Sequence, residues 1–567
     1  MDFKKLILSI ALVSMAFGVQ AQTVGKTARY CNPLPMEVGD GGQASGDVSV
    51  FQWEGKYYMF CTGGGCWVSE DMLNWDFHYV ANVPVAPDVV PYNGKFYMTG
   101  NSVRGVWVAD NPLGPYEQQG EWKNLPGLEG GWSMPFDPHI YIDEDNQPYL
   151  FWPGMAISGI YSVKLNPENL NEFVGPITHH FSFNPNHVWE RQGEQNEYTD
   201  VAWIEGPWVY KHNGTYYLQY SASGTQWRTY AEGYYKAQSV QGPYVYATNN
   251  PLLRRTDGIV TGPAHGSMVT GPDGNIWQFY TIVLRSGGRR IGMDRVIVDR
   301  AGNLTCNVTD TPQWAPNAVK DPTKGDTGSI IVSVGKINNG NGGGTTRMKA
   351  ASTETPGHGA DAALDNTTAT WWEPDPSDKQ PTLTMNLSPA VDRDRIQTFT
   401  IDGIRILFNP SQNRAGFGAA AAQLPQAGPN ANAQRPQAGS NATAQRPQQL
   451  PQAGPNTNIQ TPQPRGTAPQ AGAARPRMPF TPAVYQYKVE ASMDGQVYTT
   501  VLDRTDSKLS KNVVFEEIPP VECRYVRVTF TGWPENSNLG VLDLSVFGKA
   551  TGWSPSIVPV PPVLPMD

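Results

Sequence analysis

Ile204-Glu205-Gly206-Pro207, followed after a turn by Gly214-Thr215-Tyr216-Tyr217, is one of five segments in this 567-residue chain with the same order of residue types. Each begins with an ionisable residue and a short apolar stretch, then continues through a turn containing Gly or Asn into an aromatic-rich strand. The leading residues are 41, 49, 68 and 60 positions apart by subtraction. This is the length of a four-stranded antiparallel blade with its loops, so the repeat predicts a five-bladed β-propeller. The leading residues are Asp47, Asp88, Asp137, Glu205 and His265.

The repeat also predicts where these leading side chains lie. The first strand of each propeller blade lines the central axis. A residue at the same place in every first strand therefore projects toward the same region. Four carboxyl groups and one imidazole are expected around a common funnel.

The composition supports an all-β fold and excludes one class of partner. The chain has 17 Trp, 25 Tyr and 19 Phe together with 58 Gly and 49 Pro. Aromatic side chains favour strands, whereas Gly and Pro favour tight connections. The net charge is −9 and no block of Lys or Arg could follow a phosphate backbone, so nucleic acid is not expected as a partner.

The beginning of the chain has the pattern of an export signal. Lys4 and Lys5 precede an apolar run from residue 6 to 19, and Val19-Gln20-Ala21 offers small residues at a cleavage site. We interpret residues 1–21 as a signal peptide and expect a periplasmic or extracellular protein whose mature chain does not insert into a membrane. The five Cys form neither a disulfide framework nor a zinc site, although a Cys61–Cys66 bridge stays open.

Carboxyl groups that converge on one site are typical of enzymes that cleave glycosidic bonds. Such enzymes use one carboxylic acid to protonate the leaving oxygen and a carboxylate on the opposite side of the sugar. Like-charge repulsion in a shared pocket raises the pKa of a proton donor. In an inverting enzyme a water lies between base and sugar, and the two carboxyl groups are roughly 6.5–9.5 Å apart.

The segments resemble glycoside hydrolase family 43, a family of inverting enzymes with a five-bladed propeller, over residues 28 to 315. The resemblance implies that Glu205 is the general acid, Asp137 the residue that modulates its pKa, and Asp47 the base. Around Asp47 the sequence departs from the family, with Gly46 and Val48 where Ala and Pro are usual. The segments that carry the resemblance are Ala86-Pro87-Asp88-Val89, Phe136-Asp137-Pro138-His139, Ile204-Glu205-Gly206-Pro207 and Ala264-His265-Gly266-Ser267.

The resemblance also implies residues that contact the substrate. Arg289 resembles the family's substrate-facing Arg, and His265 would contact the sugar or contribute to a calcium or water site near the axis. Asp88 would contact the substrate or cap its loop. Trp132 would form an aromatic wall or pack in a loop core. No cofactor is expected to be required, and the calcium near the axis would be a structural ion.

A second domain is predicted after a linker at residues 316–346, in which residues 330–334 could still add a strand to the propeller. Four segments resemble discoidin-type modules, also called coagulation factor 5/8 C-terminal modules, and predict an eight-stranded jelly-roll sandwich over residues 347–550. A low-complexity stretch at 411–480 is expected to be a disordered insertion, and 551–567 a tail. The sandwich would bind glycan or serve as a structural support. The segments are Ala363–Trp372, Ile401–Ile406, Tyr487–Ser492 and Arg524–Val528.

These features together predict an exo-acting, inverting hydrolase that removes terminal α-L-arabinofuranosyl units from plant polysaccharides. The same scaffold accepts β-xylosyl, galactosyl or galactofuranosyl ends, since specificity lies in loops. The alternative from another class is a carbohydrate-binding propeller that has lost catalysis.

Overall fold

The computed structural model describes residues 29–40, 42–101, 103–123, 135–154, 156–316, 327–333, 348–387, 395–409 and 480–555. The predicted signal peptide, Trp132 and residues 411–479 lie outside this part of the chain. The regular secondary structure of the described residues is almost entirely strand, with short 3-10 helices at Val188–Glu190 and Ala360–Leu364.

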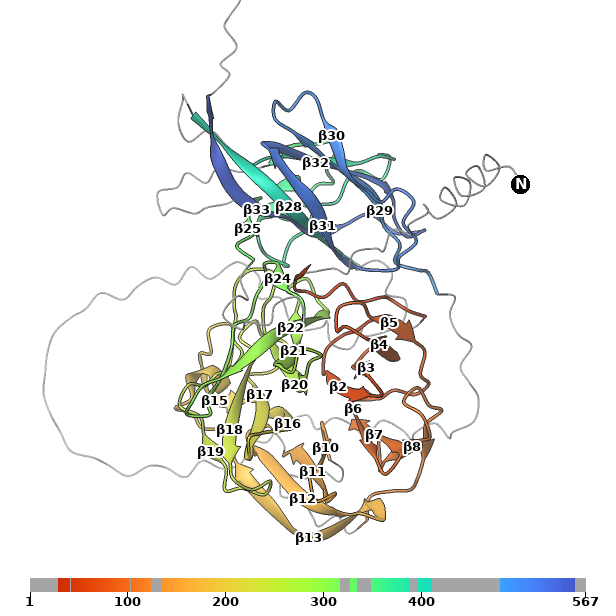
Figure 1. Cartoon of the computed structure of the whole chain (residues 1–567), viewed down its shortest axis with the longest axis vertical. Coiled ribbons are helices and arrows are strands. Elements are labelled where there is room, and N and C mark those ends of the chain that lie inside the picture. Colours follow the sequence, from red (N-terminus) through yellow and green to blue (C-terminus); the bar gives the residue numbers. More distant parts are fainter. Residues whose placement is uncertain are drawn as a thin grey trace, which may run out of the picture. The chain divides into compact units, whose positions relative to one another are not determined.

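Five antiparallel four-stranded sheets lie around one axis, so the predicted five-bladed propeller is confirmed (Figure 1). The inner strands contact one another in a closed ring, β2 with β6 and β20, β10 with β6 and β16, and β16 with β20.

Blade 1 contains β2 (Ser49–Trp53), β3 (Lys56–Phe60), β4 (Cys66–Ser69) and β5 (Asp76–His78). Blade 2 contains β6 (Val85–Tyr92), β7 (Lys95–Asn101), β8 (Trp107–Ala109) and β9 (Glu117–Gln118). Blade 3 contains β10 (His139–Ile142), β11 (Pro148–Pro153), β12 (Ile160–Asn166) and β13 (Asn169–Phe181). Blade 4 contains β16 (Glu205–His212), β17 (Thr215–Ala222), β18 (Ala231–Ala237) and β19 (Val245–Tyr246). Blade 5 contains β20 (Ala264–Thr270), β21 (Ile276–Val283), β22 (Arg289–Val298) and β23 (Leu304–Cys306).

Two further strand pairs belong to this part of the chain. The pair β1 (Arg29–Tyr30) and β24 (Gln313–Trp314) joins the two ends of the propeller sequence. The pair β14 (Arg191–Gln192) and β15 (Tyr198–Ala202) lies in the connection between blades 3 and 4.

The Gly-containing turns of the repeat form tight hairpins. The Asn93-Gly94 turn joins β6 to β7 with φ of 48° and 75°, and Asn213-Gly214 joins β16 to β17 with φ of 48° and 76°. Two consecutive left-handed residues match the right-handed twist of the strands that they connect, and Asn and Gly are the residues that adopt them most easily. These turns set the register of the inner two strands of each of these blades.

The cores lie between neighbouring blades, where the aromatic residues of the repeat are buried. The core between blades 4 and 5 also includes Leu407, Val513 and Leu542, which belong to the second domain. Burying apolar side chains from both domains in one cluster joins the domains through a shared hydrophobic core.

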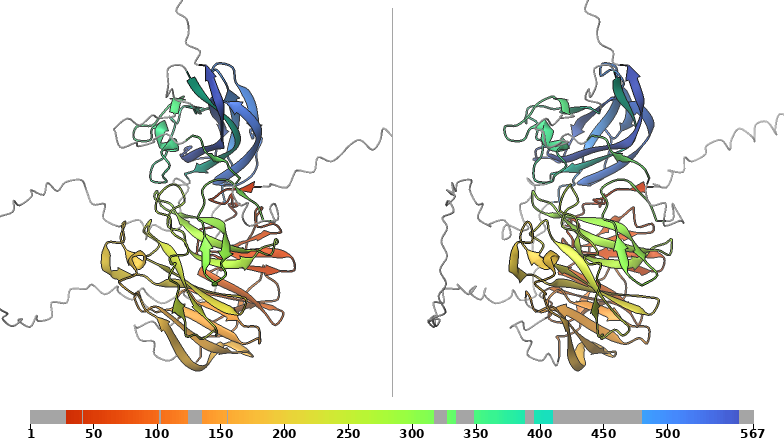
Figure 2. Two further views of the ribbon diagram at one scale, coloured as in Figure 1. Left: turned by 60° about the vertical axis from the view of Figure 1, so that its left-hand side comes forward. Right: turned by 90° about the vertical axis from the view of Figure 1, so that its left-hand side faces the viewer.

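The second domain is a sandwich of two antiparallel sheets, as predicted (Figure 2). One sheet has the order β25-β33-β28-β31 and the other β26-β27-β32-β29-β30. The strands are β25 (Ile330–Ile331), β26 (Met348–Ala351), β27 (Thr382–Asn386), β28 (Arg395–Phe408), β29 (Gln486–Ser492), β30 (Thr499–Asp503), β31 (Val513–Cys523), β32 (Tyr525–Gly532) and β33 (Val541–Pro555).

Two details of the second domain differ from the expectation. Ile330 and Ile331 pair with Gly548 and Phe547 in the sandwich, so β25 adds a ninth strand here rather than a strand to the propeller. Strand β33 continues to Pro555, so the first residues of the predicted tail belong to the sheet. Both differences arise because β33 pairs along the full length of β28 and leaves its other edge open to β25.

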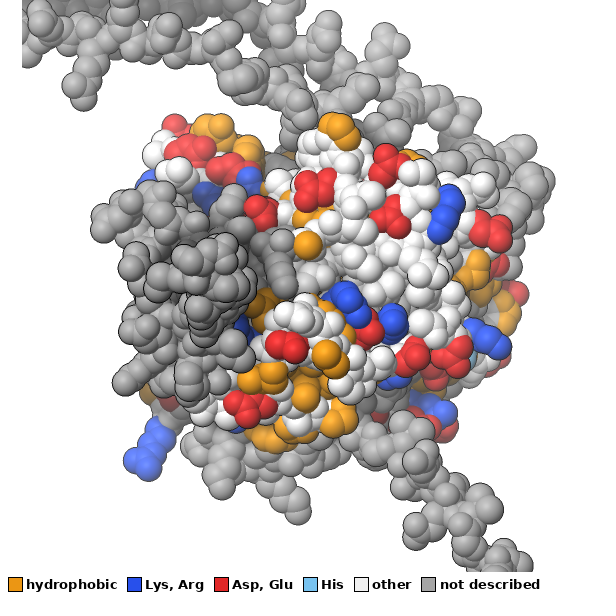
Figure 3. All heavy atoms as spheres, turned by 90° about the horizontal axis from the view of Figure 1, so that it is seen from above, with side chains coloured by type: hydrophobic (Ala, Val, Ile, Leu, Met, Phe, Trp, Pro, Cys, Tyr) orange, Lys and Arg blue, Asp and Glu red, His pale blue; other side chains and the backbone are white. Residues whose placement is uncertain are grey.

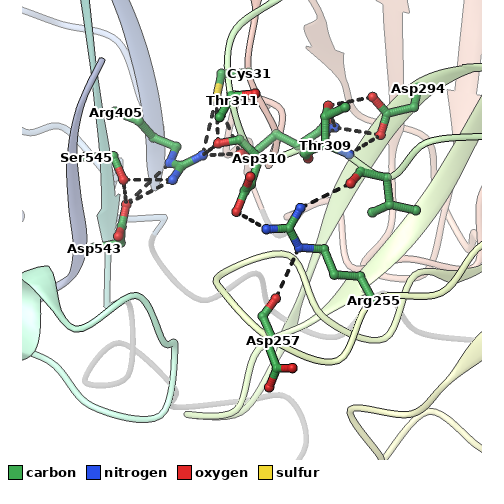
Figure 4. A network of polar contacts seen from close by, with 12 residues as sticks. Cys31, Arg255, Asp257, Asp294, Thr309, Asp310, Thr311, Arg405, Asp543 and Ser545 are labelled. Carbon is green, nitrogen blue, oxygen red and sulfur yellow. Dashed lines mark hydrogen bonds and ion pairs between the residues drawn. The ribbon is translucent and has the colours of Figure 1, made fainter. Parts of the chain in front are cut away.

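A buried arginine joins the sandwich to the propeller (Figure 4). Arg405 on β28 is fully buried, and its guanidinium lies 3.3 Å from the Asp543 carboxylate and donates to the Ser545 hydroxyl at 2.8 Å. The same group donates to the carbonyl oxygens of Asn32 and Asp310, both at 2.7 Å. One side chain therefore satisfies polar groups of both domains.

The charged surface and the cysteines have the following features. On the face shown in Figure 3, acidic and basic described side chains are interspersed, without a continuous basic area. All five cysteines are buried and free, so Cys61 and Cys66 are not bridged. Among the described residues, no helix has the length and apolar character needed to cross a membrane.

Candidate active site

The inner strand of each blade is entered through the same backbone conformation. A residue in the left-handed region is followed by one further residue, and regular pairing with the second strand begins at the next one. In blades 2, 4 and 5 this entry forms a bulge, and bulges commonly redirect side chains beside active sites. The left-handed residues are Asp47 (φ 54°), Ala86 (46°), Asp137 (38°), Gly206 (57°) and His265 (44°).

This equivalence corrects the alignment of the five leading residues. Asp47, Asp137 and His265 occupy equivalent positions, as predicted. Glu205 lies one residue before the equivalent Gly206, and Asp88 lies two residues after the equivalent Ala86.

Hydroxyl and amide side chains of the preceding blade hold these entry residues in place. The backbone N–H of Asp137 donates to Asn101 Oδ1 at 2.6 Å, and that of His265 donates to Ser221 Oγ at 2.8 Å. Because a left-handed conformation is unfavourable for a residue with a side chain, it persists where such contacts fix it. The other two contacts are Asp47 N–H to Thr281 Oγ1 at 2.9 Å and Ala86 N–H to Thr62 Oγ1 at 2.9 Å.

Asp88 joins blades and is not a member of the carboxylate cluster. Its carboxylate accepts from Ser49 Oγ at 3.2 Å and from the Ile140 N–H at 2.7 Å, and lies 3.2 Å from His139 Nδ1. The His139 ring in turn stacks on Trp208 of blade 4 at 4.3 Å. Asp88 therefore links blades 1 to 3, and its predicted contact with the substrate stays a prediction.

Asp47 lies between two cationic groups. Its Oδ1 is 2.7 Å from Arg289 Nη1 and 3.2 Å from His265 Nδ1, and its Oδ2 accepts from the Thr62 hydroxyl at 2.6 Å. Burial alone would raise the pKa of Asp47, but the charges of Arg289 and His265 hold it below its ordinary value of 3.8. Asp47 is thus an ionised carboxylate at neutral pH.

Glu205 has the opposite environment. Its Oε1 accepts from the Tyr230 hydroxyl at 2.5 Å, and it lies in one cluster with Asp137 and His265, whose ligand atoms are all within 4.8 Å of one another. Burial and then the neighbouring Asp137 carboxylate raise the pKa of Glu205 to about 8. Glu205 therefore carries a proton at neutral pH.

Asp137 and His265 connect the two carboxyl groups. His265 Nδ1 lies 3.9 Å from Asp137 Oδ2 as well as near Asp47. Although burial opposes the charged imidazolium, Asp47 and Asp137 raise the pKa of His265 to about 10. Burial raises the pKa of Asp137, whose Oδ1 accepts from Asn101 Nδ2 at 2.6 Å. The cluster thus holds one protonated acid beside one ionised carboxylate.

The family models match the two domains of the chain. Residues 42–300 match the model described as Glycosyl hydrolases family 43, and residues 477–542 match the F5/8 type C domain. Residues 42–300 form a family 43 glycoside hydrolase domain. The resemblance of both domains to these families is confirmed.

Several named relatives and one solved structure are similar to this chain. It is 26% identical over 275 residues to a β-D-galactofuranosidase of Aspergillus niger, covering 42% of this chain and 73% of the relative. It is 26% identical over 184 residues to a xylosidase/arabinosidase of Humicola insolens, covering 28% of this chain and 31% of the relative. It is 27% identical over 258 residues to an extracellular endo-α-(1→5)-L-arabinanase of Bacillus subtilis, covering 36% of this chain and 51% of the relative. The chain thus spans less than two thirds of the latter two. The crystal structure of a thermostable family-43 glycoside hydrolase is 27% identical, has a TM-score of 0.43, and covers 51% of this chain and 99% of that chain.

The family 43 domain includes site residues that the repeat did not reveal. Tyr230 precedes β18 and has no counterpart in the repeated segments, so nothing in the sequence marked it. Thr62 and Asn101 did leave a signal, because they lie just after and at the end of the second strand of their blades. Ser221 and Thr281 lie within the last three residues of the corresponding strands. Trp132 lies outside the described residues, and its role stays a prediction.

The donors around His265 are the candidates for the predicted calcium site. Calcium prefers six to eight oxygen ligands. The grouped atoms of Asp137, Glu205 and His265 supply two carboxylates and one nitrogen, and the imidazole faces Asp47 as a proton donor. This set does not fit calcium, and the reaction is described without a metal. The metal role of His265 is not tested by these donors and stays a prediction.

Proposed function

We propose that the family 43 domain hydrolyses terminal glycosidic bonds by single displacement with inversion. The observation that carries this proposal is the opposite protonation of two buried carboxyl groups. The pKa of Glu205 is raised to about 8, whereas that of Asp47 is lowered. Pairs of titratable groups with pKa values moved apart by their environment are typical of acid and base assignments.

Each residue then has a defined part in the reaction. Glu205 transfers its proton to the glycosidic oxygen while the bond to the anomeric carbon breaks. A water attacks that carbon from the opposite side, and its proton passes to Asp47. Asp137 keeps Glu205 protonated before the reaction, and Arg289 with His265 keeps Asp47 ionised.

We infer a terminal α-L-arabinofuranosyl unit as the sugar. Support comes from relatives whose names include arabinosidase and arabinanase, although their identity of about 26% leaves the loops free to differ. The galactofuranosidase relative, of which the alignment covers 73%, makes galactofuranose the second candidate. Plant polysaccharides lie outside the cell, which agrees with the export predicted from residues 1–21.

The test is a panel of four aryl glycosides: α-L-arabinofuranoside, β-D-xyloside, β-D-galactoside and β-D-galactofuranoside. We expect hydrolysis of the arabinofuranoside, release of the inverted anomer in an NMR time course, and loss of turnover in Asp47→Asn. A retained anomer would contradict single displacement. If the folded wild type hydrolyses neither the panel nor longer arabinan, the alternative of a carbohydrate-binding propeller would be favoured.

The pH dependence of kcat/KM should report the same two groups. Because Glu205 must carry a proton, kcat/KM should fall as the pH rises through about 8. The lowered pKa of Asp47 keeps the base ionised in mild acid, so Asp47 should not limit the reaction above pH 4.

Two variants should move this alkaline limb in opposite directions. Asp137→Asn removes a negative neighbour, which lowers the pKa of Glu205 and moves the limb to lower pH. Tyr230→Phe removes a hydrogen bond to the Glu205 carboxylate, which raises that pKa and moves the limb to higher pH. The measurement is kcat/KM from pH 4 to 10, and shifts in the same direction for both variants would contradict the assignment.

A further inference from the structure

A segment of the sandwich contacts a turn of the propeller next to the active site. The turn, residues 284–288, joins β21 to β22, and Arg289 is the first residue of β22. Thr367 forms a parallel bridge with Gly258, and Thr368 contacts the turn itself. Thr367 and Thr368 follow Ala360–Leu364 in the sandwich.

Thr368 accepts hydrogen bonds that the turn cannot make internally. The turn closes on itself through the amides of Leu284 and Gly287, each at 3.0 Å from its acceptor. The Arg285 N–H donates to Thr368 Oγ1 at 2.8 Å, and the Ser286 N–H donates to the Thr368 carbonyl at 2.7 Å. Thr368 is fully buried, so water does not replace it as an acceptor.

The turn has little rigidity of its own. Gly287 and Gly288 are consecutive and adopt φ of 99° and 89°. Glycine populates many backbone conformations, so a turn ending in two glycines depends on external contacts to keep one of them. Arg289 follows directly and is held by the pairing of its backbone with Val283.

Two arginine side chains in or directly after this turn form ion pairs, one of them with the active site. Arg289 Nη1 lies 2.7 Å from Asp47 Oδ1, the carboxylate to which we assign the role of base. Arg285 Nη1 lies 3.1 Å from Glu194 Oε2, which also pairs with Arg228 Nε at 3.0 Å. A shift of the turn would therefore displace both a catalytic contact and a partly exposed charged network.

We propose that Thr368 of the sandwich is a positioning residue for the propeller's active site, holding the 284–288 turn so that Arg289 stays against Asp47. This inference rests on the proposed function. It makes the sandwich a component of the catalytic architecture, in addition to any role in docking on glycan.

The test compares Thr368→Val with Thr370→Val. Valine keeps the β-branched shape of threonine but removes the acceptor for the Arg285 amide. We expect Thr368→Val to lower kcat/KM by about tenfold, within the roughly 100-fold loss that a small misplacement can cause. The acid limb should move to higher pH, because Arg289 is the chief group that lowers the pKa of Asp47. Thr370, whose hydroxyl bonds Asp365 inside the sandwich, is the matched control and should change neither quantity.

Three further measurements separate positioning from general destabilisation. Thr368→Ser retains the hydroxyl and should show the same acid limb in the pH profile of kcat/KM as the wild type. In an Arg289→Lys background, Thr368→Val should add less than its separate effect, since the two act through one contact. If Thr368→Val does not fold, hydrogen exchange of the wild type decides, and rapid exchange at the Arg285 and Ser286 amides would overturn the inference.

The outcomes also separate this inference from the proposed function. An inactive wild type would remove the proposed function itself. An active wild type with unchanged kcat/KM and acid limb in folded Thr368→Val would leave the function intact and refute the role of Thr368.

Discussion

Replacing Glu205 with Gln should lower kcat on an alkyl glycoside by about 10²–10⁴-fold, the usual contribution of a positioned general acid. Glutamine keeps the shape and the contact with Tyr230, but it has no acidic proton to transfer. KM and the melting temperature should change little, because glutamine is neutral, like the protonated carboxyl group that it replaces. The measurement is kcat and KM for alkyl and 4-nitrophenyl glycosides of the sugar that the wild type cleaves.

The leaving group provides the control for this prediction. Nitrophenolate departs without protonation, so Glu205→Gln should lose less activity on the nitrophenyl glycoside than on the alkyl one. Asp47→Asn removes the base instead and should lose activity on both to a similar degree. Equal losses for both substrates in Glu205→Gln would contradict its role as acid.

Replacing Arg405 with Met should lower the free energy of unfolding by about 3–5 kcal/mol, the cost of removing one partner of a buried ion pair. The Asp543 carboxylate and the carbonyl oxygens of Asn32 and Asp310 would remain buried without this donor. The measurement is chemical denaturation followed by tryptophan fluorescence. Because the core between blades 4 and 5 includes Leu407 and Leu542, both domains should lose stability together.

Two further variants test the origin of this loss. The double variant Arg405→Met with Asp543→Leu removes the whole pair and should recover part of the stability, since an apolar replacement avoids an unpaired charge. Lys95→Met breaks the exposed pair with Asp110 and should leave the stability nearly unchanged. A loss in Arg405→Met as small as that in Lys95→Met would show that the interface does not depend on this network.

The sequence repeat predicted the number of blades but not the register within them. The hairpin turns, such as Asn93-Gly94, have a fixed chemistry and are visible in the sequence. The entry residues have no common side chain, since they include Ala86 and Gly206 as well as acids. For this reason Asp88 and Glu205 were aligned with residues that they do not match.

Contacts between residues far apart in the sequence set another limit on what the sequence can predict. Only the resemblance to the family points to Arg289, and its contact with Asp47, 242 positions away, is evident only in the structure. Ile330 and Ile331 looked like a strand, but their partner in β33 lies more than 200 positions later. Local patterns predict an element without showing which element it joins.

The five entry positions share one backbone conformation but carry different side chains. Gly206 is restricted to glycine, because a Cβ there would lie 2.6 Å from the His265 ring as well as requiring φ of 57°. Ala86 occupies the entry position of blade 2 and carries only a methyl group there, while its backbone N–H donates to the Thr62 hydroxyl. In a scaffold formed of repeated units, selection or a protein engineer can therefore introduce a new functional group at the entry position of one blade while the other four blades keep their chemistry.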